Sequence, residues 1–334
     1  MAKVVKFNEI SGVDSLHIVE EDVRDPGAGE VRVAVKTAGL NRAEYLYLHG
    51  QYFMPPQLPS LIGVEGAGVI EKVGPGVEGI SVGDEVCITP NMQPDAHGVI
   101  GELAVVPANA IVPKPANVSW EEAASIWMAY LTAYGGLVEF GGLREGAGQT
   151  VVISAASSSV GRPAIQIAKA HGATVIATSR SSAKRDGIMD AGPDHLIATG
   201  EEDFVARVQE ITGGKGFDIA FDPVSGDFLT TLSEAAGLEA TIVEYGALAM
   251  AETPFPLFPA IGKGLKVCGF HLVWNLLDFP DRTARATSHI SEHLAKGVYN
   301  PVVDRVFPLE DVQGAYRYME QGEQLGKIVV KVAD

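Results

Sequence analysis

The chain has 334 residues, of which 46% are hydrophobic and 20% charged; this balance excludes wholesale disorder, and the length allows two domains. It carries 25 Lys and Arg against 42 Asp and Glu, a formal net charge of −17. Such an excess of negative charge repels phosphate backbones and anionic lipid, so we expect neither nucleic acid nor a membrane as a partner. The opening MAKVVKFNEI lacks the layout of a signal peptide, and we expect a cytoplasmic protein.

The only two cysteines, Cys87 and Cys268, lie far apart and in no metal-binding pattern. Their number excludes a disulfide framework and a cysteine-rich zinc site. Both lie in strand-like segments, so we expect them to be buried thiols. The histidines show no spacing typical of metal ligands, and we expect no bound metal.

The first third of the chain consists of short β-like runs. From Lys3 to about Pro115 these runs are interrupted by Gly and Pro, a texture that predicts an antiparallel, barrel-like domain. At Ser119 the sequence pattern changes from strand-like to helical, because Ser119 and Glu122 form a capping-box pattern ahead of the apolar run Ala123–Tyr134. We predict one helix over that run, stopped or loosened by the two glycines that follow it.

From Gln149 onwards strand and helix patterns alternate, which predicts a parallel sheet covered on both faces. Six strands that alternate with helices are typical of a doubly wound dinucleotide-binding domain. The predicted strands are Thr150–Ser154, Thr174–Thr178, His195–Thr199, Phe217–Phe221, Ala240–Tyr245 and Lys266–His271. The predicted helices are Arg162–His171, Ala183–Asp190, Asp203–Thr212, Asp227–Ala236 and Arg282–Lys296. The closing GKIVVKV returns to strand texture, so we assign it to the first domain.

The turn after the first of these strands is the predicted nucleotide site. It reads SAASSSVG, with serines where G-x-G-x-x-G would have glycines. Small side chains keep the approach to the helix N-terminus open, a serine hydroxyl can itself donate to phosphate, and Gly161 lets helix and strand pack closely. We therefore expect Ser157, Ser158, Ser159 and Val160 to hold the phosphates of a dinucleotide.

The end of the second strand predicts which dinucleotide binds. An NAD enzyme usually has Asp or Glu there, to accept from the ribose hydroxyls. This chain has Ser179 and Arg180, followed by Lys184, and no carboxylate before Asp186. These groups suit a 2′-phosphate, so we predict NADPH as the cofactor. The alternative is a solvated loop with ordinary surface cations.

Several segments in order along the chain carry a family resemblance. They are TAGLNRAEYLYLHGQY, LIGVEGAGVIEKVGPGVEGISVGDEV, AASIWMAYLTAYGGL, AASSSVGRPAIQIAKAHGATVIAT and GKIVVKV. Together they resemble the medium-chain dehydrogenase/reductase superfamily, in its zinc-independent quinone oxidoreductase-like branch. The resemblance implies an α/β protein with a GroES-like β-rich catalytic domain (residues 1–121 and 297–334) and a doubly wound Rossmann NADP-binding domain (residues 122–296). It also implies a homodimer.

The resemblance places Asn41 and Val64 where zinc-dependent relatives have a cysteine and a histidine as zinc ligands. An amide and an isopropyl group cannot replace a thiolate and an imidazole, so we expect no zinc. Without a Lewis acid, oxidation of an alcohol loses its main chemical support. The remaining chemistry is hydride transfer from NADPH to a quinone or an α,β-unsaturated carbonyl.

The resemblance also implies two candidate catalytic residues, Asn41 and Tyr52, in the substrate cleft. For Asn41 the alternative is capping of a turn after Gly39. Tyr52 would donate a phenolic hydrogen bond, and its alternative is a packing or surface aromatic.

The remaining candidates are cofactor contacts implied by the resemblance. Thr132 would contact the nicotinamide amide, unless its hydroxyl bonds to its own helix backbone. Further candidates are Tyr245, Gly246, Ala247, Phe270 and Lys327. Thr199 stands where relatives often have a tyrosine for the 2′-phosphate, a departure that weakens the NADPH assignment. Two other functions stay open: an enoyl-thioester reductase and a non-catalytic NADPH-binding protein.

Overall fold

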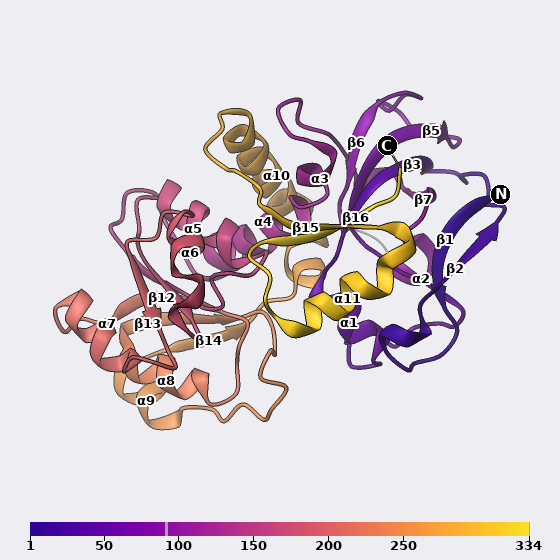
Figure 1. The fold of residues 1–334 in the computed structure, drawn as a ribbon. Helices are drawn as coiled ribbons and strands as arrows, with labels where there is room; N and C mark the ends of the chain where they lie inside the picture. The colour runs from indigo at the N-terminus through magenta and orange to yellow at the C-terminus, as the bar shows by residue number, and fades with distance from the viewer. Residues whose placement is uncertain (91–92, 334) are drawn as a thin grey trace. The chain divides into compact units, whose positions relative to one another are not determined.

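The computed structural model describes residues 1–90 and 93–333, which form two compact units (Figure 1). Unit 1 comprises Met1–Met128 and Pro301–Asp334, and unit 2 comprises Ala129–Asn300. The sequence-based boundaries, after residues 121 and 296, lie a few residues before these divisions.

Unit 1 is built mainly from antiparallel strands, as the first third of the sequence predicted, and its last two strands pair in parallel. One sheet has the order β2-β1-β4, and a seven-stranded sheet has the order β15-β16-β3-β5-β6-β8, with β7 also paired to β3. The strands are β1 Ala2–Phe7, β2 His17–Glu21, β3 Glu30–Gly39, β4 Ser60–Leu61, β5 Gly66–Val73, β6 Glu85–Ile88, β7 Leu103–Pro107, β8 Ile111–Pro113, β15 Val303–Pro308 and β16 Lys327–Lys331.

Strand β3 holds unit 1 together because it has three partners. It pairs with β5, β7 and the C-terminal strand β16, where Val330 lies opposite Ala38. Its sequence EVRVAVKTAG alternates, so Val31, Val33 and Val35 enter the core while the residues between them are partly exposed. Through the pairing with β16, the C-terminal segment lies in unit 1.

The helices of unit 1 are short except for the last. They are α1 Arg42–Leu48, α2 Pro94–His97, α3 Trp120–Ala123 and α11 Val312–Gln321, with single 3-10 turns at η1 Val13–Ser15, η2 Ala108–Ala110 and η6 Leu309–Asp311. The amphipathic α11 buries Val312, Ala315, Tyr316 and Met319.

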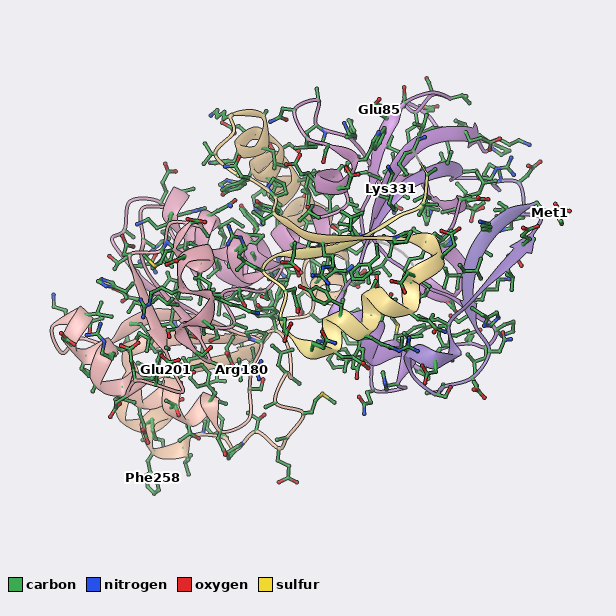
Figure 2. The ribbon with its side chains drawn as sticks, in the orientation of Figure 1. Met1, Glu85, Arg180, Glu201, Phe258 and Lys331 are labelled. Atoms are coloured by element: carbon green, nitrogen blue, oxygen red, sulfur yellow. The ribbon has the colours of Figure 1, made fainter. Side chains whose placement is uncertain are left out.

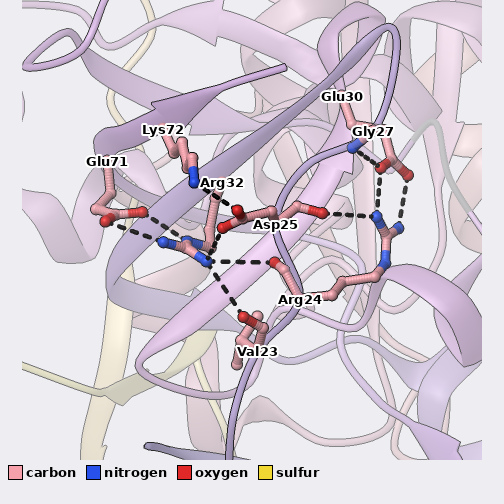
Figure 3. A network of polar contacts seen from close by, with 8 residues as sticks. All are labelled: Val23, Arg24, Asp25, Gly27, Glu30, Arg32, Glu71 and Lys72. Atoms are coloured by element: carbon pink, nitrogen blue, oxygen red, sulfur yellow. Dashed lines mark hydrogen bonds and ion pairs between the residues drawn. The ribbon is translucent and has the colours of Figure 1, made fainter. Parts of the chain in front are cut away.

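Charged side chains fasten the segment between β2 and β3 to the sheet (Figure 3). Arg32 donates to Glu71, with an Nε–Oε2 distance of 2.5 Å, and pairs with Asp25 at 3.1 Å. Arg24 makes a bidentate contact with Glu30. This contact lowers the pKa of Glu30 to about 2. Such partly exposed pairs define the path of the segment more than they add stability.

Unit 2 contains the six-stranded parallel sheet that the sequence predicted. Its order is β11-β10-β9-β12-β13-β14, the doubly wound order of dinucleotide-binding domains. The strands are β9 Thr150–Ile153, β10 Thr174–Ser179, β11 His195–Ala198, β12 Phe217–Asp222, β13 Ala236–Glu244 and β14 Lys266–Gly269. The chain adds β10 and β11 on one side of β9, and then β12, β13 and β14 on its other side. The order of strand addition therefore reverses between the neighbours β9 and β12.

All five predicted helices of unit 2 are present, with ends shifted by a few residues. They are α5 Gly161–Ala170, α6 Arg185–Met189, α7 Phe204–Thr212, α8 Phe228–Ala235 and α10 Pro280–Ala295, and they are joined by α9 Leu257–Lys263, the 3-10 turn η4 Ser182–Lys184 and the π-helix η5 Val273–Leu277. Asp203 caps α7 by accepting from Ala206 N–H at 3.0 Å. Gly213 ends the same helix in a left-handed conformation.

The helix predicted over Ala123–Tyr134 is wrong in its extent. The capping box of Ser119 and Glu122 forms, but it begins the short α3, which ends at Ala123. A second helix, α4, covers Trp127–Tyr134 and continues as a π-helix, η3, through Gly135–Phe140.

The two glycines that were expected to end this helix serve close packing instead. A Cβ atom on Gly135 would lie 2.4 Å from the Phe270 ring. One on Gly136 would lie 2.1 Å from the Phe221 ring. The glycines are therefore required where the π-helix approaches the sheet, and this tertiary contact overrides their weak helix propensity.

We predict that Gly136→Ala destabilises the protein by about 1–3 kcal/mol, because the added methyl group overlaps the buried Phe221 ring. Urea denaturation measures the change. Gly262→Ala on α9 is the matched control, since a Cβ there meets nothing within 4 Å. Equal unfolding midpoints for the two variants would contradict the packing argument.

Candidate functional site

The carboxyl ends of the parallel strands in unit 2 contain most of the predicted cofactor-binding residues. In open α/β sheets, ligands bind at this edge, at the point where the strand order reverses. In unit 2 that point lies between β9, which is followed by Ser154, and β12, which ends in Asp222. Both side chains are fully buried.

The turn after β9 is tightly organised by its own backbone. Ala156 N–H donates to Thr178 O on β10 at 3.0 Å, and Ser158 N–H donates to Ala155 O at 2.9 Å. The Ser158 hydroxyl accepts from Gly161 N–H at 3.0 Å and so supports the start of α5. A Cβ on Gly161 would lie 2.7 Å from Ala155 O. Gly161 is thus required for close packing of helix against strand, as the sequence predicted.

The rest of the turn suits an anion. Ser157, Ser159 and Val160 are partly exposed and lead directly into α5. The N–H groups of the first turn of a helix lack intrahelical partners and favour negative charge. Arg162 has a different role, because its buried guanidinium donates to the carbonyl of Gly187 and links α5 to α6.

The end of β10 presents the predicted cations at the same edge of the sheet. Arg180 is exposed (Figure 2), Ser179 and Lys184 are half-buried, and Ser179 O accepts from Thr199 N–H at 2.8 Å. The exposed carboxylate of Glu201 accepts from Ser182 N–H at 2.9 Å.

This contact places a negative charge on the predicted 2′-phosphate loop. The Ser182 N–H lowers the pKa of Glu201, so its carboxylate is charged at neutral pH. Sequence reasoning missed this group, which lies after the third strand and reaches back across the sheet edge.

The segment after β13 contains the predicted nicotinamide contacts. The Tyr245 ring stacks on Phe221, with centroids 3.9 Å apart and planes at 13°. Burial raises the pKa of its hydroxyl. Gly246 and Ala247 follow as exposed residues that offer backbone groups. In this structure Tyr245 contributes by packing, and a direct contact with a cofactor stays a prediction.

Sequence analysis missed a polar cluster beside this segment. Ser225 has a left-handed backbone (φ 60°), and its N–H donates to Asp222 Oδ2 at 2.7 Å. Its Oγ lies 2.6 Å from Glu244 Oε2 and 2.7 Å from Gly246 O. The signal was present: both acids end apolar strand runs, FDIAFD and ATIVE, on neighbouring strands.

Two further predicted cofactor contacts are inside unit 2. Thr132 is buried on α4. Phe270 is 5% exposed and meets Phe140 edge to face, with centroids 5.2 Å apart. Neither assignment is tested by these contacts.

The other candidate residues lie in unit 1, around a buried ammonium group. Lys327 is 1% exposed, and its Nζ lies 2.5 Å from both Asn41 Oδ1 and Glu65 Oε2. The second oxygen of Glu65 accepts from Met128 N–H at 2.8 Å. Lys327 therefore cross-links β16 to the start of α1 and the residue before β5.

Glu44 completes this polar core of unit 1. Its carboxylate accepts from the N–H groups of Asn41 and Val64, at 3.0 and 3.1 Å, and from Tyr316 Oη at 2.9 Å. Burial raises the pKa of Glu44. The Asn41 amide donates to Gly39 O at 3.1 Å and to Glu44 Oε1 at 3.3 Å. Both N–H donors of the Asn41 amide are thus engaged by residues close to it in the sequence. This arrangement corresponds to the alternative role of Asn41, capping of the turn after Gly39.

Tyr52 is the other predicted catalytic residue. It packs against the core of unit 1, and its ring meets Phe53 edge to face with centroids 5.4 Å apart. Burial, and next the charge of Glu44, raise the pKa of Tyr52 to about 12. The phenol therefore keeps its proton across the physiological pH range.

Within residues 1–90 and 93–333, no three His, Cys, Asp or Glu side chains are grouped in a way that could hold a metal ion. In the same part of the chain, no helix has the length and apolar character needed to cross a membrane.

A β-rich unit and a parallel sheet of dinucleotide-binding order define a two-domain, nicotinamide-dependent oxidoreductase. Known proteins agree: the family "Alcohol dehydrogenase GroES-like domain" matches residues 27–116, and "Zinc-binding dehydrogenase" matches residues 159–288. The rat synaptic vesicle membrane protein VAT-1 homolog is 30% identical over 321 residues, which cover 91% of this chain and 77% of that protein.

Solved structures give the same result. Escherichia coli quinone oxidoreductase complexed with NADPH has a TM-score of 0.89 and 28% identity, covering 98% of this chain and 99% of that one. An NAD-dependent alcohol dehydrogenase has a TM-score of 0.89 and 30% identity, covering 99% and 100%. The chain belongs to the medium-chain dehydrogenase/reductase superfamily, in its quinone oxidoreductase- and VAT-1-like branch. The family resemblance and the fold class inferred from the sequence are confirmed.

We predict that Lys327→Met destabilises the protein by about 3–5 kcal/mol, because it leaves the buried Glu65 carboxylate without its counter-ion. Lys327→Met combined with Glu65→Gln should cost less than Lys327→Met alone. Urea denaturation measures both. Lys72→Met is the control, since its exposed pair with Asp25 should contribute less than about 1 kcal/mol. A double variant less stable than Lys327→Met would refute the pairing.

Proposed function

We propose that this oxidoreductase is a zinc-independent reductase that uses NADPH to reduce a quinone or an α,β-unsaturated carbonyl. The observation that carries the proposal is the Lys327 ammonium, 2.5 Å from both Asn41 and Glu65. Asn41 and Val64 stand where zinc-dependent relatives have zinc ligands. A dication beside Asn41 would meet a buried positive charge, and neither an amide nor an isopropyl group would replace a thiolate or an imidazole.

The residues at the carboxyl edge of the Rossmann domain fit the dinucleotide. Ser157, Ser158, Ser159 and Val160 would hold its pyrophosphate, while Arg180 and Lys184 would hold the 2′-phosphate. The backbone of Gly246 and Ala247 would face the nicotinamide. Similarity to a quinone oxidoreductase complexed with NADPH supports this choice, and similarity to an NAD-dependent enzyme keeps NADH as the alternative.

Bound NADPH would supply a hydride. A conjugated acceptor needs only stabilisation of the oxygen on which negative charge develops, and Tyr52 can supply that as a donor. The pKa of Tyr52, about 12, keeps its phenol protonated at any physiological pH. The protein would otherwise align the reactants and exclude water.

The proposal is tested by NADPH oxidation with 1,4-benzoquinone, an alkenal and crotonyl-coenzyme A, run side by side. We expect turnover of the first two to exceed both the uncatalysed rate and the rate with the thioester. Preference for crotonyl-coenzyme A would instead identify an enoyl-thioester reductase. Tight NADPH binding without turnover of any acceptor would identify a non-catalytic NADPH-binding protein. Stoichiometric zinc in the purified protein would refute the zinc-independent mechanism.

We predict that Arg180→Ala weakens NADPH binding by about 10- to 100-fold, because a charge-assisted contact with the 2′-phosphate is lost. NADH binding should be unchanged. Glu201→Gln should act in the opposite direction, by less than about fivefold, since it removes an exposed negative charge from the same loop.

Fluorescence titration with each dinucleotide measures these affinities. Lys215→Ala, at an exposed lysine of the Rossmann domain, is the control. Equal effects of Arg180→Ala on NADPH and NADH would refute the 2′-phosphate site.

We also propose that the chain forms a homodimer through the edge of the Rossmann sheet. Strand β14 is an end strand of this sheet, and α9, which precedes it in the chain and contacts β13, exposes large apolar side chains. Exposed apolar patches of this kind mark interaction surfaces. The exposed residues on α9 are Leu257, Phe258 and Ile261. A mass of 35.2 kDa by light scattering would refute the dimer.

A further inference from the structure

At the ends of β12 and β13, the contacts of Ser225 require one more proton than is present when Glu244 is ionised. Ser225 Oγ lies 2.6 Å from Glu244 Oε2 and 2.7 Å from Gly246 O, both hydrogen-bond distances. A serine hydroxyl has a single proton to donate, and a backbone carbonyl can only accept. Both contacts are satisfied when Ser225 donates to Gly246 O and a protonated Glu244 donates to Ser225 Oγ.

The surroundings of Glu244 favour this acid form. Its other oxygen, Oε1, and Asp222 Oδ1 are both buried, and neither has a hydrogen-bond partner among the residues that the structure describes. The two residues are paired in register on neighbouring parallel strands. The buried carboxyl group of Asp222 and the partly exposed one of Glu244 cannot both be charged at such neighbouring positions without a large cost. Burial, and next the charge of Asp222, raise the pKa of Glu244 to about 8.

The other groups near Glu244 do not compensate a negative charge. Tyr245, on its own strand, and Cys268, on β14, are neutral acids whose pKa values are raised mainly by burial. Asp222, on β12, carries a like charge when ionised.

The helices packed against β13 bring no cation to this end of the strand. Lys263 on α9 donates to the carbonyls of residues 233, 234 and 236, near the start of β13. Glu234 on α8 is exposed, and Glu139 on η3 pairs with Arg285.

We propose that Glu244 in its acid form is a positioning residue, which acts through Ser225 to hold Gly246 and the segment up to Met250 at the carboxyl edge of the sheet. This inference rests on the proposed function in one respect, that the dinucleotide binds at this edge. The segment has two other ties, from Leu248 N–H to Pro223 O (2.8 Å) and from Ala249 N–H to Val224 O (3.0 Å). Loss of the Glu244 proton therefore loosens the segment without unfolding the domain.

The test compares the wild type with Glu244→Gln, whose neutral amide still donates to Ser225, and with Ser225→Ala, which breaks the link. NADPH and NADH affinities are measured by fluorescence titration from pH 6.5 to 9.5, and amide hydrogen exchange of residues 245–250 is followed at the same pH values. Glu234→Gln, at the exposed glutamate of α8, is the matched control. Thermal unfolding at each pH separates local loosening from loss of the fold.

We expect wild-type dinucleotide binding to weaken by about fivefold relative to Glu244→Gln as the pH rises through 8, because one hydrogen bond is lost. Exchange of residues 245–250 should rise in parallel. Ser225→Ala should bind weakly at every pH, and Glu234→Gln should follow the wild type.

A constant ratio of wild-type to Glu244→Gln affinity across the pH range would overturn the positioning role. Equal hydrogen exchange in the two proteins at every pH would overturn it as well. If neither dinucleotide binds, the proposed function fails, whereas hydrogen exchange still decides whether the Glu244 proton holds the segment.

Discussion

The GroES-like domain depends on the burial of one ammonium group. Burial of a lysine at 1% exposure is costly unless its charge is compensated, and Lys327 donates to the Glu65 carboxylate and to the side-chain oxygen of Asn41. These contacts determine more than stability. They fix the entry of the C-terminal strand into the sheet and the N-terminus of α1, and they engage the side-chain oxygen of Asn41.

The Rossmann domain meets a different constraint, because its functional edge must hold an anion in an acidic protein. The net charge of −17 opposes a dinucleotide at long range. In the proposed site, helix N–H groups at the serine turn and the cations Arg180 and Lys184 after β10 would compensate locally. The Glu244 proton has a related effect, since it removes a negative charge from this edge.

Sequence patterns predicted the elements well where periodicity is strong. The six parallel strands follow from apolar runs buried on both faces, and Gly161 follows from the need for a close helix–strand contact. The error at Ala123–Tyr134 has a physical cause. Gly135 and Gly136 are weak helix formers on their own, but the Phe270 and Phe221 rings pack against them, and these rings lie far away in the sequence.

The sequence alone determined the family, the two-domain α/β fold and the candidate positions at the strand ends, because periodicity and local motifs carry that information. Only the tertiary structure decided which polar groups meet. The pairing of Lys327 with Asn41 spans 286 residues, and Asp222, Ser225 and Glu244 come together only when two strands lie side by side. Charge, proton occupancy and hydrogen-bond capacity depend on such contacts and on burial, and neither can be read from residues one at a time.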